Sequence, residues 1–172
     1  MGDQDDFDEL VGGLDHPMII VTTAAGDVRA GCLVGFHAQC GIEPPLYAVW
    51  LSKANHTYRI GALADVFAVH FPRRDDLELA ELFGTNTGNE VDKFDKCAWT
   101  AGPEGVPLLD AVPDRFVGRR TALMDPGADH VCLMLAPIRT DGDPGDAHDR
   151  LAFFQVKDLD AGHPAEDRQQ PS

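Results

Sequence analysis

Basic residues are scarce in this chain. Its 172 residues include 14 Lys and Arg against 29 Asp and Glu, which gives a formal net charge of −15. An acidic surface repels the phosphates of nucleic acids and anionic membranes, so we expect neither as a partner. No apolar run approaches the roughly 20 residues that a transmembrane helix needs. The N-terminal MGDQDDFDEL is acidic where a signal peptide is basic, which favours a cytoplasmic location.

Motifs of several common sites are also missing. The four cysteines, Cys32, Cys40, Cys97 and Cys132, form no Cys-x-x-Cys pair, and their spacing matches no zinc site. We therefore expect buried, reduced thiols and no metal centre. The seven histidines form no His-Glu-x-x-His motif, and no strand is followed by the Gly-x-Gly-x-x-Gly of a Rossmann site.

The hydrophobic content of 44% is enough for one packed domain. Runs rich in β-branched and apolar residues predict about seven strands, at 18–23, 28–34, 46–51, 66–71, 115–124, 130–138 and 151–156. Helical spacing predicts an acidic arm or helix in 1–16, a helix after the N-cap residue Asn55, and another that begins at Asp75. Residues 84–114 read as a long ordered loop.

Hairpin connections between most strands favour a mostly β fold, an antiparallel barrel with helical insertions. The expected organisation is an arm over 1–16, a barrel domain over 17–157 and a polar C-terminal tail over 158–172.

The order of several short segments resembles the flavin reductase-like family of FMN-binding split-barrel proteins. The segments are MIIVTT, GCLVGFHAQCGIEPPL, LSKANHTYRI, FAVHF, DKF and DHVCLMLAPI, between Pro17 and Ile138. The resemblance implies a split antiparallel β-barrel that binds FMN, with FAD as the alternative flavin. In this family the segment at Leu33, Val34, Gly35 and Phe36 runs beside the isoalloxazine ring. This chain has Leu33, Gly35 and Phe36 where the family has polar residues, which removes hydroxyl contacts but keeps backbone contacts.

The segment Ser52-Lys53-Ala54-Asn55-His56-Thr57 combines a strand end with a helix start. Free backbone N–H groups and the helix dipole attract a phosphate at such a position. Capping alone also explains Asn55, so the residues by themselves leave both interpretations open. The resemblance favours the phosphate, with Ser52, Asn55 and Thr57 as ligands and Lys53 and His56 beside them.

Three further residues carry predictions from the resemblance. His130, after Asp129, corresponds to a family histidine near the flavin and the nicotinamide, and we expect it to be the catalytic residue; a structural histidine at the strand start is the alternative. Lys93 is expected either to reach a cofactor phosphate or to be a surface lysine. His37 is a candidate to line the pocket. His70, within a buried run, is expected to be a hydrogen-bonded core residue.

The resemblance therefore implies an FMN-dependent oxidoreductase, most simply an NAD(P)H:flavin reductase. It also implies a homodimer, and a flavin-dependent monooxygenase as a partner that would use the reduced flavin. A non-catalytic flavin-binding module, or a flavoprotein that acts on another small ligand, is the alternative.

Overall fold

The computed structural model describes residues 2–85, 91–143 and 149–160. Its main element is a seven-stranded sheet in the order β2-β1-β5-β8-β9-β4-β3, with all neighbours antiparallel. The strands are β1 (Ile19–Ala25), β2 (Val28–Val34), β3 (His37–Ile42), β4 (Pro45–Ser52), β5 (Val66–His70), β8 (Arg115–Met124) and β9 (His130–Asp141). A second sheet pairs β6 (Trp99–Ala101) with β7 (Pro107–Leu109).

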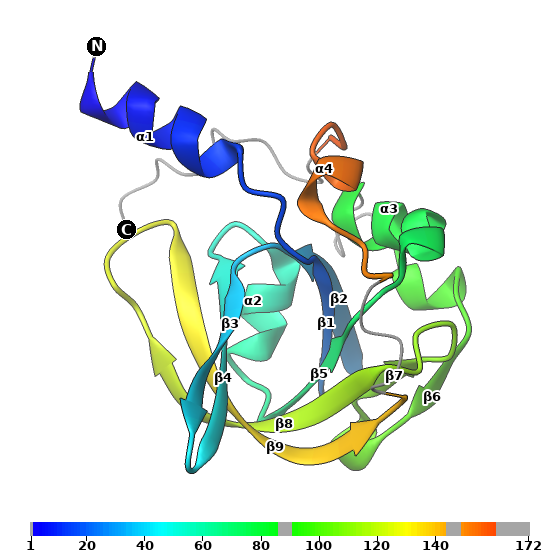
Figure 1. Ribbon diagram of the computed structural model, residues 1–172. Coiled ribbons are helices and arrows are strands. Elements are labelled where there is room, and N and C mark those ends of the chain that lie inside the picture. Colours follow the sequence, from blue (N-terminus) through cyan, green and yellow to red (C-terminus); the bar gives the residue numbers. More distant parts are fainter. Residues whose placement is uncertain (1, 86–90, 144–148, 161–172) are drawn as a thin grey trace.

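The described residues form four α-helices, and Figure 1 shows α1 projecting away from the strands while α3 and α4 lie together. They are α1 (Asp3–Gly12), α2 (His56–Gly61), α3 (Leu77–Thr85) and α4 (Phe153–Val156). Three short 3-10 turns occur at Arg74–Asp76, Lys93–Asp95 and Pro103–Gly105. No described helix is both long and apolar enough to cross a bilayer.

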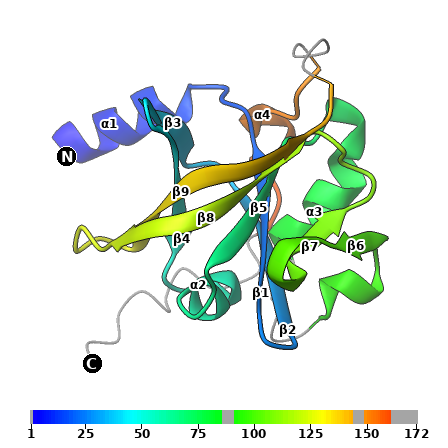
Figure 2. The same cartoon turned by 90° about the horizontal axis from the view of Figure 1, so that it is seen from below.

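The edge strands of the large sheet, β2 and β3, are consecutive in the chain. Gly35 and Phe36 alone join them, so the sheet curls until its two edges meet there (Figures 1 and 2). The backbone N–H of Trp50 on β4 donates to the carbonyl of Phe36 at 2.9 Å. Helix α2 contacts β1, β2 and β4 and so covers the opening between the edges. This confirms the predicted split β-barrel with helical insertions.

Alternation along the strands explains the barrel core. Val49 and Leu51 of β4 point inward with Val131 and Leu133 of β9, and all four are almost completely buried. Strands β1 and β5 are instead covered on both faces, because α3 and the β6–β7 hairpin pack on their outer side. Burial on both faces explains why these two strands read as continuous apolar runs rather than as alternating patterns.

The predicted hairpin of the first two strands is confirmed. It turns at Gly26, whose φ of 58° suits glycine. Helix α1 lies within the acidic segment 1–16, and its apolar residues Phe7 and Leu10 are 58% and 74% exposed. The tail predicted over 158–172 lies mostly outside the described residues, because the description ends at residue 160.

Other predictions are wrong. The segment 151–156 forms α4 rather than a strand, because its pairing is limited to isolated bridges and the Gln155 side chain accepts a hydrogen bond from the Ala152 N–H at 3.2 Å. Strand β3 was not predicted, since its exposed sequence HAQCGI lacks apolar alternation. The expected loop at 84–114 contains β6 and β7.

The cysteine prediction is partly wrong. Cys32 and Cys132 are buried, as expected, but Cys40 is exposed and Cys97 is half-buried. Cys40 is exposed because it lies on β3, an edge strand with a register shift between Gln39 and Gly41.

Candidate functional site

A cavity of about 430 Å³ lies where the two edges of the sheet meet. We call it the crossing cavity, after the chain crossing at Gly35 and Phe36. It brings together seven of the residues selected from the sequence, which are Leu33, Val34, Gly35, Phe36, Ser52, Asn55 and His130. They come from the end of β2, the crossing itself, the end of β4 with the start of α2, and the start of β9.

Strand register explains why distant residues meet here. In the β4–β9 pair, Ser52 lies directly opposite His130. The Phe36 ring lies 5.0 Å from the His130 ring, centroid to centroid, at an interplanar angle of 56°. The crossing needs a small residue, because a Cβ at Gly35 would lie 3.0 Å from His16 Nε2. The cavity therefore has an aromatic and backbone wall beside an imidazole.

His130 is held by its neighbour in the sequence. Its Nδ1 lies 2.8 Å from Asp129 Oδ1, so the carboxylate accepts a hydrogen bond from Nδ1–H and orients the ring. Its side chain is 25% exposed, and Nε2 makes no hydrogen bond within the described part of the chain. His130 can therefore offer Nε2 to a bound molecule without breaking an existing contact.

The start of α2 forms the polar end of the cavity. Asn55 Oδ1 accepts a hydrogen bond from Thr57 N–H at 3.0 Å, which is the N-cap predicted from the sequence. Ser52 Oγ accepts from Ala54 N–H at 3.4 Å. Lys53 N–H donates to the Asp129 carbonyl at 2.9 Å and ties this segment to the turn before β9.

Four of the selected residues do not line the crossing cavity. Lys53 points to Asp125, with Nζ and Oδ1 2.9 Å apart. Thr57 is 1% exposed. His56 and Lys93 line a second cavity of about 310 Å³.

Lys93 is buried, so its alternative prediction as a surface lysine is wrong. Its Nζ donates to the carbonyls of Gly31 and Phe83 at 2.9 and 3.0 Å. Burial lowers the pKa of the Lys93 ammonium, and Cys32 partly offsets this. These two hydrogen bonds connect β2 to α3, and they engage the ammonium with backbone carbonyls.

The cavity also contains residues that the sequence did not indicate. His16 stacks on Phe153, with ring centroids 5.0 Å apart and planes at 12°. These two residues come from opposite ends of the chain, so no local pattern predicts their contact. Trp50 and Cys32 also line the cavity. Their positions near Ser52 and Leu33 on the same strands were the sequence signal that could have indicated them. Burial raises the pKa of the Cys32 thiol, while Lys93 and hydrogen bonds from Thr57 and Asn55 act in the opposite direction.

Two histidines lie outside the crossing cavity. His70 is fully buried; its Nδ1 bonds the Ile20 carbonyl at 3.1 Å, and its Nε2 accepts from Leu109 N–H at 3.0 Å. This confirms the prediction of a hydrogen-bonded core histidine. His37 contacts the Tyr47 hydroxyl and the Pro17 carbonyl, both at 2.7 Å, so its prediction as a lining residue is wrong.

The comparisons with known proteins agree with one another. A model of the flavin reductase like domain matches residues 11–158. An FMN reductase (NADH) of Agrobacterium fabrum is 29% identical over 141 residues, which cover 80% of this chain and 78% of that protein.

Two solved structures share the fold. A homologue of nitrilotriacetate monooxygenase component B from Mycobacterium thermoresistibile has a TM-score of 0.77 at 19% identity and covers 99% of this chain and 91% of its own. An NADH:FAD oxidoreductase of Streptomyces globisporus has a TM-score of 0.75 at 21% identity, with coverages of 87% and 86%.

Proposed function

We propose that this chain, which belongs to the flavin reductase-like family, is an enzyme that transfers hydride from NADH to FMN. The observation that carries the proposal is the crossing cavity, where an apolar wall, a polar helix start and an oriented histidine meet. When bound, FMN supplies the hydride acceptor at its N5 atom, and the protein supplies binding and orientation.

The residues of the cavity fit a flavin. Leu33, Val34 and Gly35 offer an apolar surface and backbone groups to a flat ring, and Phe36 closes one side. Ser52 and Asn55 lie at the polar end, beside the N-terminus of α2, and we propose them as the ligands of the phosphate. Lys53 follows Ser52 in this segment, but its ammonium pairs with Asp125, so we assign it no contact with the phosphate.

His130 is the proposed catalytic residue. Its ring lies beside Phe36 at the cavity, and with Nδ1–H bonded to Asp129 the Nε2 atom can accept one hydrogen bond from the nicotinamide amide. Hydride transfer requires C4 of the nicotinamide and N5 of the flavin to be held in close contact, so a group that fixes the nicotinamide raises the rate. Asp129 positions His130 and thereby acts on the reaction through it.

We also propose a homodimer. Phe36 is 55% exposed beside the cavity, and the apolar side of α1 is exposed at Phe7 and Leu10. A second copy would cover such surfaces. Sedimentation at micromolar concentration is expected to give twice the 18.6 kDa mass of the chain, and a monomer with flavin bound would contradict the dimer.

We also propose a partner protein and a cellular location. Reduced flavin is released to a flavin-dependent monooxygenase, as the name of one structural relative suggests for that relative. Free thiols at all four cysteines suit a reducing compartment, and we propose the cytoplasm.

Anaerobic addition of NADH to the FMN-loaded protein tests the function. The enzyme is expected to bleach the visible flavin absorption within seconds, at a rate that depends on the protein. A protein that binds FMN but does not bleach it would be the non-catalytic flavin-binding module. Failure to bind FMN, FAD or riboflavin would contradict both functions.

A further inference from the structure

His16 is a second histidine in the wall of the crossing cavity, and the proposed function assigns it no role. It lies before β1, and its ring is half-buried. Its Nε2 lies beside the crossing, because a Cβ at Gly35 would be 3.0 Å from this atom. His130 lies beside Phe36, the other residue of the crossing. Each of the two crossing residues therefore has an imidazole next to it.

A short antiparallel pairing fixes the position of His16. Phe153 N–H donates to the His16 carbonyl at 2.9 Å, and Met18 N–H donates to the Leu151 carbonyl at 2.9 Å. The imidazole then stacks on the Phe153 ring, with centroids 5.0 Å apart and planes at 12°. A side chain that is already held by its backbone and by a ring stack loses little freedom when a ligand binds.

The contact of Nδ1 decides which ring nitrogen of His16 carries the proton. Nδ1 lies 3.2 Å from the Leu14 carbonyl oxygen, which can only accept, so Nδ1 is the donor in this contact. In the neutral imidazole Nε2 is then an acceptor. Within the described part of the chain Nε2 makes no hydrogen bond. The cavity wall beside Gly35 therefore offers one hydrogen-bond acceptor to a ligand.

We propose that His16 positions the flavin by accepting a hydrogen bond from the N3–H group of the isoalloxazine ring. This inference rests on the proposed function, which places the ring against Leu33 to Phe36 and so beside His16. The oxidised ring has one N–H group, at N3, and its remaining polar atoms offer no donor. An acceptor at Nε2 can therefore pair with only one atom of the ring, and this contact fixes which way the ring faces in the cavity.

The surroundings of His16 suit a ring edge better than a phosphate. Met18 Sδ would be 3.4 Å from the same Cβ at Gly35, and Phe153 covers one face of the imidazole. The polar end of the cavity, at the start of α2, is formed by other residues. In apolar surroundings a hydrogen bond that is left unmade is costly. A flavin that cannot donate at N3 should therefore bind less tightly.

Binding of FMN and of 3-methyl-FMN, in which a methyl group replaces the N3 hydrogen, tests the proposal. Titration of flavin fluorescence gives both dissociation constants without NADH. The wild type is expected to bind FMN about tenfold more tightly than 3-methyl-FMN, which corresponds to about 1.4 kcal/mol. In His16→Ala this preference should disappear, because the acceptor is absent and the methyl group has room. His16→Gln has an amide oxygen that can replace Nε2 as the acceptor, and it should keep most of the preference.

His130→Ala is the matched control, because it removes the other imidazole of the cavity. It should leave the ratio of the two dissociation constants at the wild-type value. Circular dichroism of all variants separates a lost contact from lost folding. An equal ratio in the wild type and His16→Ala, or no preference for FMN in the wild type, would overturn the role of His16 and leave the proposed function intact. Failure of the wild type to bind either flavin would contradict the function itself.

Discussion

Two histidines at two regions of the barrel show opposite uses of the same side chain. His70 is fully buried at the end of β5, with both ring nitrogens hydrogen-bonded to backbone groups. His130 lies at the start of β9 beside the crossing cavity, and within the described part of the chain its hydrogen bond is made through Nδ1. The difference indicates that His70 holds the fold together, while His130 has a nitrogen left for a ligand.

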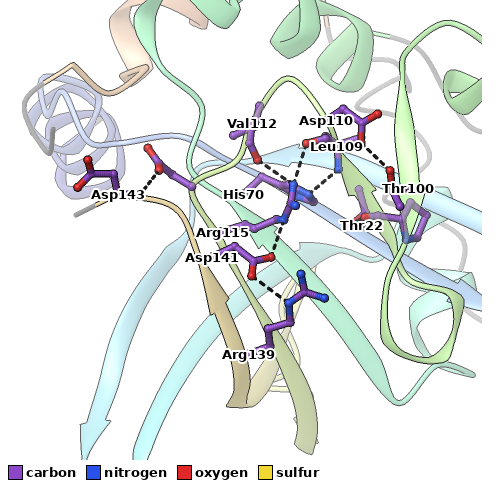
Figure 3. A network of polar contacts seen from close by, with 12 residues as sticks. Thr22, His70, Thr100, Leu109, Asp110, Val112, Arg115, Arg139, Asp141 and Asp143 are labelled. Atoms are coloured by element: carbon purple, nitrogen blue, oxygen red, sulfur yellow. Dashed lines mark hydrogen bonds and ion pairs between the residues drawn. The ribbon is translucent and has the colours of Figure 1, made fainter. Parts of the chain in front are cut away.

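The groups around His70 are also hydrogen-bonded or paired with one another. Around His70, Arg115 donates to the carbonyls of Leu109 and Val112 and pairs with Asp141, which also accepts from Arg139 (Figure 3). These contacts fix the segment after β7 onto the barrel. A cavity of about 330 Å³ lies beside this network, and there Arg115 pairs with Asp141 and Arg150 with Asp114.

The largest expected effect is the loss of His70. His70→Ala removes a buried ring and leaves Leu109 N–H and the Ile20 carbonyl without partners. The free energy of unfolding should fall by about 3 to 5 kcal/mol. Urea denaturation of the wild type, His70→Ala and His130→Ala measures this. A fall of similar size in His130→Ala would remove the contrast between the two histidines.

The pH dependence of stability should show the same contrast. Burial lowers the pKa of His70 to about 3, against about 6.5 in the unfolded chain. Below about pH 6.5 the unfolded state therefore binds a proton that the folded state does not. The contribution of neutral His70 to the free energy of unfolding is therefore fully present above pH 6.5. It is lost as pH falls toward 3, at up to about 1.4 kcal/mol per pH unit.

Unfolding experiments between pH 7 and pH 4 measure this slope. Burial also lowers the pKa of His37, which contributes in the same direction. His70→Asn removes the titrating group and should flatten the slope. A slope that is unchanged in His70→Asn would show that other groups carry it.

His130→Ala should give the next largest effect. We expect the reduction of bound FMN by NADH to slow by about 10- to 100-fold, because the nicotinamide loses a positioning contact. FMN affinity and the free energy of unfolding should change little. Stopped-flow bleaching at saturating NADH measures the rate, and an unchanged rate would leave His130 with a structural role alone.

Ser52→Ala should give the smallest effect. It removes a hydroxyl at the polar end of the cavity and should weaken FMN binding by about 1 to 2 kcal/mol, a typical value for a hydrogen bond to a charged group. Riboflavin, which has no phosphate, should bind equally to wild type and variant. Equal losses for FMN and riboflavin would instead assign the change to the local contact between Ser52 and Ala54 N–H.

These expectations show what the sequence alone could predict. Strand runs such as 66–71 and the N-cap Asn55 are local signals, and both were predicted. Seven of the residues selected from the sequence line the crossing cavity, and each lies in a short segment that resembles the family. The contacts of Lys93 were not predictable, because its partners Gly31 and Phe83 come from segments that only the folded chain brings together.

The His16–Phe153 stack was not predictable for the same reason. It joins residues that are far apart in the sequence, and no spacing rule relates them. Strand β3 was missed for a different reason, since an exposed edge strand has no apolar alternation to mark it.

The position of FMN in a crystal structure of the complex tests the central claim most directly. We predict the isoalloxazine ring against Leu33 to Phe36, the phosphate near Ser52 and Asn55, and His130 Nε2 facing the open side of the ring. FMN bound instead in the cavity beside Phe71 and Phe116, at the His70 region, would contradict the account.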